Sequence, residues 1–269
     1  MIMKLSFIGA GNMGKAMLGG VIKSGVVSPS DIMISDLYEP SLDAVKSEFG
    51  VNTTTDSKEA VRFGDVVIFA VKPNIIGKVM ESVKDVVTVE KIVVSIAAAV
   101  SIDVMESIIG DDKKIIRVMP NTPALIGEAM SALCKNTNVD DESLNQVLSI
   151  FNSFGEAEVV TESLMDAVVG VSGSGPAYVF MFIEAMADAA VLSGMPRAQA
   201  YKFAAQTVLG AAKMVMDTGK HPGELKDMVC SPGGTTVEAV ATLEEFGMRN
   251  SVIKGVLSCI DKSVRMSNK

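Results

Sequence analysis

The chain has 269 residues, of which 48% are hydrophobic and 21% charged, a composition that excludes a disordered protein and predicts about two domains. The net charge of −8 and the isoelectric point near 4.8 argue against nucleic acid or an anionic membrane as partner, because both require a basic face. Three isolated cysteines and a single histidine, His221, argue against a zinc site and against a disulfide framework, so we expect no metal. The apolar start is short and lacks a cleavage pattern, which favours a reduced, cytoplasmic protein.

A glycine-rich motif opens the chain. The apolar run 5–8 leads directly into Gly-Ala-Gly-Asn-Met-Gly at residues 9–14. In this Gly-x-Gly-x-x-Gly pattern, Gly9 permits a tight turn, Gly11 lets the backbone approach a pyrophosphate, and Gly14 allows the next helix to pack closely on the strand. We therefore expect a dinucleotide phosphate at the start of that helix.

The segments that follow support this interpretation. Apolar residues recur at helical spacing from Met13 to Val21, and Gly25 is placed to end the helix. A second strand over 31–35 ends at Asp36, which is suited to accept the hydroxyl groups of the ribose. The alternative for Asp36 is a solvated turn residue.

Strand and helix signals then alternate up to residue 161. The predicted strands cover residues 65–71, 91–96, 115–119 and 158–160. The predicted helices lie between them, over residues 42–49, 75–83, 101–110 and 140–151, with Ser101 and Asp140 as caps and Gly50 and Gly155 as stops. The near-continuous Val and Ile character of 65–71 is typical of a parallel sheet covered on both faces. Residues 1–161 are thus predicted to form a doubly wound Rossmann domain of the α/β class.

Residues 162–269 carry only helical signals and are predicted to form an all-helical dimerisation and substrate domain. A glycine-rich break at 172–176 leads into an apolar helix over 177–194, whose Glu184 and Asp188 favour burial in protein over burial in lipid. Pro196 opens the next helix, and several helices are apolar on more than one face. This favours packing against a second subunit, with packing inside one chain as the alternative.

The ends of three strands supply candidates for a nicotinamide pocket, since the ring is expected beyond the carboxyl ends of parallel strands. They are residues 70–73, 95–98 and 119–123. Asn121 lies between two prolines, so its amide is expected to be free to meet a ligand. Pro73 and Pro123, each taken singly, are better explained as strand terminators.

The shortage of proton donors limits the chemistry. Ketone reduction needs an acid, yet His221 is predicted in an exposed turn, and Lys72 is as readily a solvated or phosphate-facing lysine. Reduction of a protonated imine has no such need.

The loop 230–238 is the candidate substrate site. Thr235 and Glu238 match a capping box at the start of a helix, where N–H groups of the Gly233–Gly234 turn are suited to bind a carboxylate. The Thr236 hydroxyl would then face a substrate nitrogen. The alternative is a helix cap without a ligand.

Together these motifs resemble those of pyrroline-5-carboxylate reductases, over essentially the whole chain. The resemblance rests on residues 7–14, 70–73, 117–123, 170–178 and 231–236, of which the last two segments are the specific ones. It implies reduction of 1-pyrroline-5-carboxylate to L-proline, the last step of proline biosynthesis, by hydride transfer from NAD(P)H. It also implies a helical homodimer, often assembled into a larger ring, with each active site between one subunit's cofactor domain and the helical domain of its mate.

The site residues follow from the motifs and this resemblance. Substrate contacts are assigned to Ser231, Gly233, Gly234, Thr235 and Thr236, with Thr236 as the catalytic residue. Cofactor contacts are assigned to Gly9, Ala10, Gly11, Asn12, Met13, Gly14, Asp36, Asp56, Ala70, Val71, Lys72, Pro73, Ala97 and Asn121.

Two departures from the family pattern stand out. Many relatives carry a small polar or basic residue after the second strand, whereas this chain has Asp36 and no lysine until Lys46, so we expect NADH to be used better than NADPH. Relatives also commonly have glycine at the position of Ala99, so this turn is expected to be slightly stiffer.

Three other functions share some of these features. A β-hydroxyacid dehydrogenase shares the first motif but needs a lysine that 169–183 lacks. A cofactor-sensing binding protein would have lost the loop 231–236, which is intact. A reductase of a six-membered cyclic imine stays open.

Overall fold

A computed structural model describes residues 3–267. The chain divides into two compact units. Unit 1 holds the chain up to Ser174 together with the segment from Cys259 on, and unit 2 holds Gly175–Ser258.

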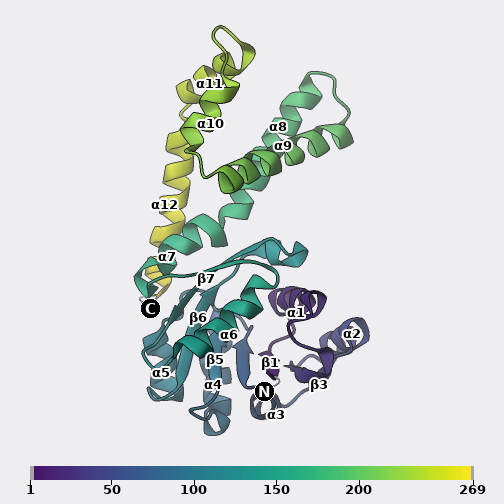
Figure 1. Ribbon diagram of the computed structural model, residues 1–269, viewed down its shortest axis with the longest axis vertical. Coiled ribbons are helices and arrows are strands. Elements are labelled where there is room, and N and C mark those ends of the chain that lie inside the picture. Colours follow the sequence, from purple (N-terminus) through teal and green to yellow (C-terminus); the bar gives the residue numbers. More distant parts are fainter. Residues whose placement is uncertain (1–2, 268–269) are drawn as a thin grey trace. The chain divides into compact units, whose positions relative to one another are not determined.

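Unit 1 is built on one eight-stranded sheet (Figure 1), with the strand order β3-β2-β1-β4-β5-β6-β7-β8. The strands are β1 (Leu5–Ile8), β2 (Ile32–Ser35), β3 (Asn52–Thr54), β4 (Val66–Phe69), β5 (Ile92–Ser95), β6 (Lys114–Met119), β7 (Ala129–Lys135) and β8 (Gly155–Val159). The first six are parallel and follow the order 3-2-1-4-5-6 of dinucleotide-binding domains, which confirms the predicted fold class.

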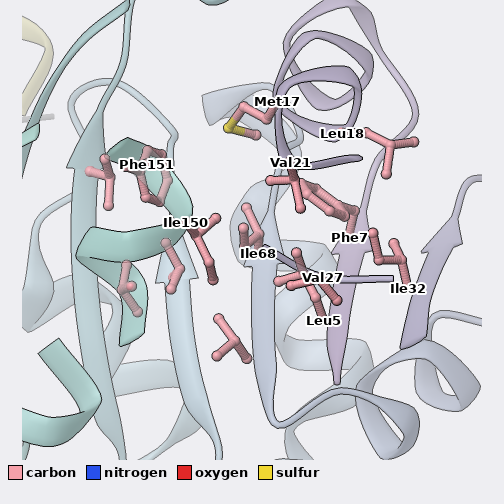
Figure 2. Close-up of a cluster of buried hydrophobic side chains, with 14 of the residues drawn as sticks. Leu5, Phe7, Met17, Leu18, Val21, Val27, Ile32, Ile68, Ile150 and Phe151 are labelled. Atoms are coloured by element: carbon pink, nitrogen blue, oxygen red, sulfur yellow. The ribbon is translucent and has the colours of Figure 1, made fainter. Parts of the chain in front are cut away.

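Helices cover both faces of this sheet, and the strands bury side chains toward both. Phe7 and Ile68 belong to one core cluster, whereas their neighbours Ile8 and Phe69 belong to the other. The first cluster, drawn in Figure 2, packs α1 (Asn12–Ser24), α2 (Glu39–Phe49) and α6 (Asp141–Asn152) on the sheet. The second packs α3 (Ser57–Phe63), α4 (Pro73–Val83) and α5 (Ile102–Ile109). Each fully buried large apolar side chain contributes about 1.5–3 kcal/mol, which explains the Val and Ile runs.

Several predicted boundaries in unit 1 are confirmed by their caps. Gly25 and Gly50 adopt the left-handed conformation after α1 and α2, and the side chains of Ser101 and Asp140 accept backbone N–H groups at the starts of α5 and α6. Gly155 is a correction, because α6 ends at Asn152 and Gly155 begins β8. A Cβ there would lie 2.1 Å from the carbonyl oxygen of Ala129, so the close pairing of β7 and β8 requires this glycine.

The sheet also contains elements that the sequence interpretation omitted. Both β3 and α3 are short, and β7 pairs antiparallel with β6, so the sheet is not purely parallel. The residues of β7 are mostly apolar and do not alternate with polar ones, so the sequence contains little signal for the direction of this strand.

Unit 2 is helical, as predicted, but has little core of its own. It contains α8 (Gly175–Leu192), α9 (Arg197–Thr218), α10 (Pro222–Val229), α11 (Thr235–Glu245) and the first part of α12 (Met248–Ser267). Only small residues are fully buried between α8 and α9, namely Ala187, Ala200 and Ala204. Large apolar side chains of these helices stay exposed in the single chain, among them Phe180, Met181, Leu192, Phe203, Leu209 and Met216.

The predicted glycine-rich break at 172–176 is confined to Ser174, a bend between two helical segments. After α7 (Met165–Val168) comes a π-helical turn over Val169–Gly173, and α8 begins at Gly175. Pro176 lies in the first turn of α8, where a proline removes no helical hydrogen bond.

Ala99 is the non-glycine residue with a positive φ, 60°, in the described chain. Since this conformation costs roughly 1–2 kcal/mol for a residue with a Cβ, we expect Ala99→Gly to raise the free energy of unfolding by about 0.5–1 kcal/mol. Ala98→Gly is the matched control, and should lower it by a similar amount, because Ala98 has no such strain to relieve. Urea denaturation measures both; shifts in the same direction would contradict the explanation.

Candidate active site

The turn between β1 and α1 cannot be built without two of its glycines. Gly9 has a φ of +114°, and a Cβ on it would lie 2.6 Å from the carbonyl oxygen of Ala70 at the end of β4. A Cβ on Gly14 would lie 2.5 Å from the carbonyl oxygen of Gly9. The motif therefore packs the start of α1 against the adjacent strand ends, as its sequence predicted.

Gly11 has a different surrounding, which fits a bound phosphate. It is the N-cap residue of α1, no side chain caps the helix there, and a Cβ on Gly11 would meet nothing within 4 Å. The first-turn N–H groups of α1 lack helical partners and lie at the positive end of the helix dipole. These residues can hold the pyrophosphate of a dinucleotide on backbone groups.

Asp36 lies at the end of β2 and fixes this turn. Its carboxylate accepts the N–H of Ala10 at 2.7 Å and that of Tyr38 at 2.9 Å. It also lines a cavity of about 360 Å³, so it is more than a solvated turn residue. The cavity is lined by Ile8, Gly9, Ser35, Asp36, Leu37, Ser57, Val71, Ile75, Lys78, Val79 and Ser82.

This cavity corrects one step of the sequence argument. No lysine follows Asp36 closely along the chain, but Lys78 of α4 lines the same cavity as Asp36. Sequence reasoning missed Lys78 because it is 42 positions away, and only the sheet order brings α4 to this place.

The remaining predicted cofactor residues lie around the ends of the strands. Lys72 is exposed and is the N-cap residue of α4, which begins at Pro73. Ala97 is buried after β5, with its N–H bonded to the hydroxyl of Ser95. Asp56 accepts the N–H of Lys58 and caps α3, a role that the sequence interpretation did not assign.

Asn121 departs from its prediction. Its side chain is 8% exposed, and both ends of the amide are bonded within the protein. Oδ1 accepts the N–H of Met130 at 3.0 Å, and Nδ2 donates to the carbonyl oxygen of Ser172 at 3.1 Å. The expectation of an amide free to meet a ligand is therefore wrong.

A partly buried ion pair joins β6, the strand before Asn121, to Glu162. Arg117 of β6 donates to Glu162 at 3.0 Å, and Glu162 also accepts the N–H of Ile102 at the start of α5. Beside this pair, burial and then the charge of Glu162 raise the pKa of Cys134 to about 12. That thiol stays protonated near neutral pH and is no nucleophile.

The predicted substrate loop lies in unit 2, at the start of α11. The N–H of Gly234 donates to the carbonyl oxygen of Ser231 at 3.0 Å, and Gly233 has a φ of +66°. The predicted capping box is not formed, because Gly234 is the N-cap residue and Thr235 already belongs to the helix. The first turn of α11 consequently has no side-chain cap. Thr236 is half-buried there, and within residues 3–267 its hydroxyl pairs with no protein group.

The other candidates play no part in this arrangement. His221 is exposed and caps α10 by accepting the N–H of Gly223, and the described chain contains no cluster of metal-binding side chains. A larger cavity of about 660 Å³, between α1 and the segment 124–128, includes none of the predicted site residues.

Comparison with known proteins decides the family. A family model described as pyrroline-5-carboxylate reductase dimerisation matches residues 162–266. A pyrroline-5-carboxylate reductase of Escherichia coli is 55% identical over 267 residues, covering 98% of both chains. This chain belongs to the pyrroline-5-carboxylate reductase family. A relative of that name from Methanosarcina acetivorans is 47% identical over 99% of this chain and 98% of its own.

Solved structures of the family agree with the fold. The pyrroline-5-carboxylate reductase of Coxiella burnetii has a TM-score of 0.93 at 34% identity, covering 99% of both chains. The Plasmodium falciparum pyrroline carboxylate reductase, solved with NADP bound, has a TM-score of 0.90 at 33% identity over 98% of each chain. A second family model, described as NADP oxidoreductase coenzyme F420-dependent, matches residues 4–99.

Membership of the family explains the exposed apolar helices. By length and composition, one stretch of the described chain, Glu162–Leu192, could cross a membrane, although only 6% of its most apolar window is buried in the single chain. This stretch begins the dimerisation domain of the family, so its apolar faces are surfaces for another subunit. The dimerisation model thus favours burial against another subunit, which stays a prediction for this stretch.

Proposed function

We propose that this protein reduces 1-pyrroline-5-carboxylate to L-proline with a nicotinamide cofactor. The observation that carries the proposal is the 55% identity over nearly the full chain. The loop 231–236, in which the family resemblance places the substrate, is also intact. When bound, the cofactor supplies the hydride. The protein's own residues bind the cofactor and the substrate and orient the C=N bond.

Each half of the proposed site has its own task. The uncapped N–H groups at the starts of α1 and α11 bind anions, pyrophosphate in unit 1 and the substrate carboxylate in unit 2. Thr236 hydrogen-bonds the ring nitrogen and orients the C=N bond. An imine that already carries its proton needs no general acid, which fits a chain whose single histidine, His221, is exposed and caps α10.

The test follows NADH absorbance after pyrroline-5-carboxylate is added to purified protein. Oxidation that is faster with this substrate than with its six-membered analogue supports the proposal. Oxidation only with the six-membered ring would favour the rival imine reductase, and NADH binding without oxidation would favour a cofactor-sensing protein.

We further propose that NADH is used better than NADPH. The carboxylate of Asp36 would repel a 2′-phosphate, but Lys78 on the same cavity would attract it, so the two are tested together. We expect Asp36→Ser to raise the kcat/KM ratio of NADPH to NADH at least tenfold, or about 1.4 kcal/mol. Lys78→Ala should lower this ratio, because it removes the positive charge that would attract the 2′-phosphate. A parent enzyme that prefers NADPH, together with its loss in Lys78→Ala, would overturn the proposal.

The assembly and location are proposed from the same family. We expect a cytoplasmic homodimer formed by residues 162–269, further assembled into a ring of dimers, with residues 1–161 as the cofactor domain. Light scattering of the purified protein gives the number of subunits.

A further inference from the structure

Two buried asparagines lie at opposite ends of the β6–β7 pair and share two types of hydrogen bond to the backbone. Asn121 follows β6, Asn136 follows β7, and each is 8% exposed. In each, Oδ1 accepts a backbone N–H, from Met130 and Ile115 respectively. Their Nδ2 groups donate to the backbone carbonyls of Ser172 and Lys113, and Nδ2 of Asn136 also donates to the carboxylate of Glu106 at 2.9 Å.

The two differ in what their bonds hold. The hydrogen bonds of Asn136 connect loops at the amino end of β6, away from the predicted cofactor site. Asn121 lies at the carboxyl end of β6, where a nicotinamide ring is expected. The Ser172 carbonyl that it binds belongs to the π-helical turn Val169–Gly173. Such turns are rare and occur frequently at functional sites.

A second contact joins the same two segments. A Cβ on Gly173 would lie 2.7 Å from the terminal carbon of Met119, so the π-helical turn packs directly on the end of β6. The residue after the turn, Ser174, accepts a hydrogen bond from the thiol of Cys259 at 3.2 Å. The loop after β6 is therefore fixed by a packed and hydrogen-bonded support.

We propose that Asn121 is a positioning residue, which holds the loop that walls the nicotinamide pocket on the π-helical turn instead of contacting the cofactor. The inference rests on the proposed function. Both polar ends of the amide are engaged, so the side chain has one donor hydrogen left and no role in hydride transfer. A shift of the loop by about 1 Å would misplace the ring against the substrate, which lowers turnover strongly while leaving the grip on the pyrophosphate intact.

The test compares Asn121→Asp with Asn136→Asp. Each variant keeps an acceptor for the backbone N–H and sets a carboxylate against a carbonyl oxygen. Asn136→Asp also sets a carboxylate against that of Glu106, so the control should lose at least as much stability as Asn121→Asp. For Asn121→Asp we expect kcat to fall at least about tenfold while the Kd of NADH changes less than about threefold. For Asn136→Asp we expect kcat within about twofold of the parent enzyme, since its bonds lie at the other end of the strands.

Equal kcat values in the two variants would show that Asn121 contributes only to stability, and would overturn the inference. A large rise in the Kd of NADH for Asn121→Asp would also overturn it, in favour of direct cofactor contact. If either aspartate variant fails to fold, Asn121→Ser and Asn136→Ser are compared with the same two outcomes. An inactive parent enzyme would instead refute the proposed function, and the inference with it.

Discussion

Gly11→Ala is expected to yield a folded protein that binds NADH at least about tenfold more weakly. A Cβ at this position meets no protein atom within 4 Å, and the backbone at Gly11 is extended, so the substitution causes neither clash nor strain. Alanine is a poorer N-cap than glycine, and the free energy of unfolding should fall by no more than about 1 kcal/mol. The new methyl group would occupy the space through which a pyrophosphate reaches the first turn of α1. Fluorescence titration with NADH and urea denaturation separate the two effects.

Two other glycines of α1 serve as controls. Gly14→Ala places a Cβ 2.5 Å from the carbonyl oxygen of Gly9, so this variant should lose stability as well as cofactor binding. Gly19→Ala places its Cβ 3.4 Å from the ring of Phe49, an ordinary contact, and should bind NADH like the parent. Unchanged NADH affinity in Gly11→Ala would mean that the phosphates bind elsewhere.

Local sequence was sufficient for much of the cofactor domain. Gly25, Ser101 and Asp140 mark helix ends because a left-handed residue or a capping side chain acts within a few positions of the backbone it satisfies. The direction of β7 and the neighbours of Lys78 depend instead on how distant strands pair, and no local pattern contains that information.

Asn121 illustrates a second limit. Its flanking prolines do remove secondary structure from the segment, and the amide was expected to seek a ligand for that reason. In the folded chain the amide is used by Met130 and Ser172, the second of which is 51 positions away. A lack of hydrogen-bond partners nearby in the sequence therefore does not predict a free side chain, since buried polar groups are hydrogen-bonded to whichever residues the fold places beside them.

The glycine-rich segments differ for a related reason. Those at Gly9 and Gly233 form turns, whereas Val169–Gly173 continues a helix. Met119 packs so closely on Gly173 that a side chain at this position would clash with it, and Gly170 is buried. Glycine thus marks close approach as well as chain reversal, and composition alone does not separate the two.

Thr236→Ala is expected to lower kcat/KM for pyrroline-5-carboxylate by about 10- to 100-fold and to leave the Kd of NADH unchanged. The hydroxyl is half-buried in the uncapped first turn of α11 and has no partner within the described chain, so it is available to the substrate nitrogen. A hydrogen bond to a charged group contributes about 1.5–3 kcal/mol, which sets this range. Steady-state kinetics at saturating NADH give the first quantity and fluorescence titration the second.

Two variants make this result specific to the hydroxyl group. Thr236→Ser keeps the hydroxyl and should retain most of the activity. Thr242 lies on the same helix, and its hydroxyl donates to the carbonyl oxygen of Glu238. Thr242→Ala should therefore lower the free energy of unfolding by no more than a few tenths of a kcal/mol and leave turnover unchanged. Because the Thr236 hydroxyl pairs with no group of the described chain, Thr236 has no structural hydrogen bond to lose, and any decrease in kcat/KM reports on the substrate. Activity of Thr236→Ala equal to that of Thr242→Ala would leave the main-chain N–H groups of α11 as the only part of this loop that holds the imino acid.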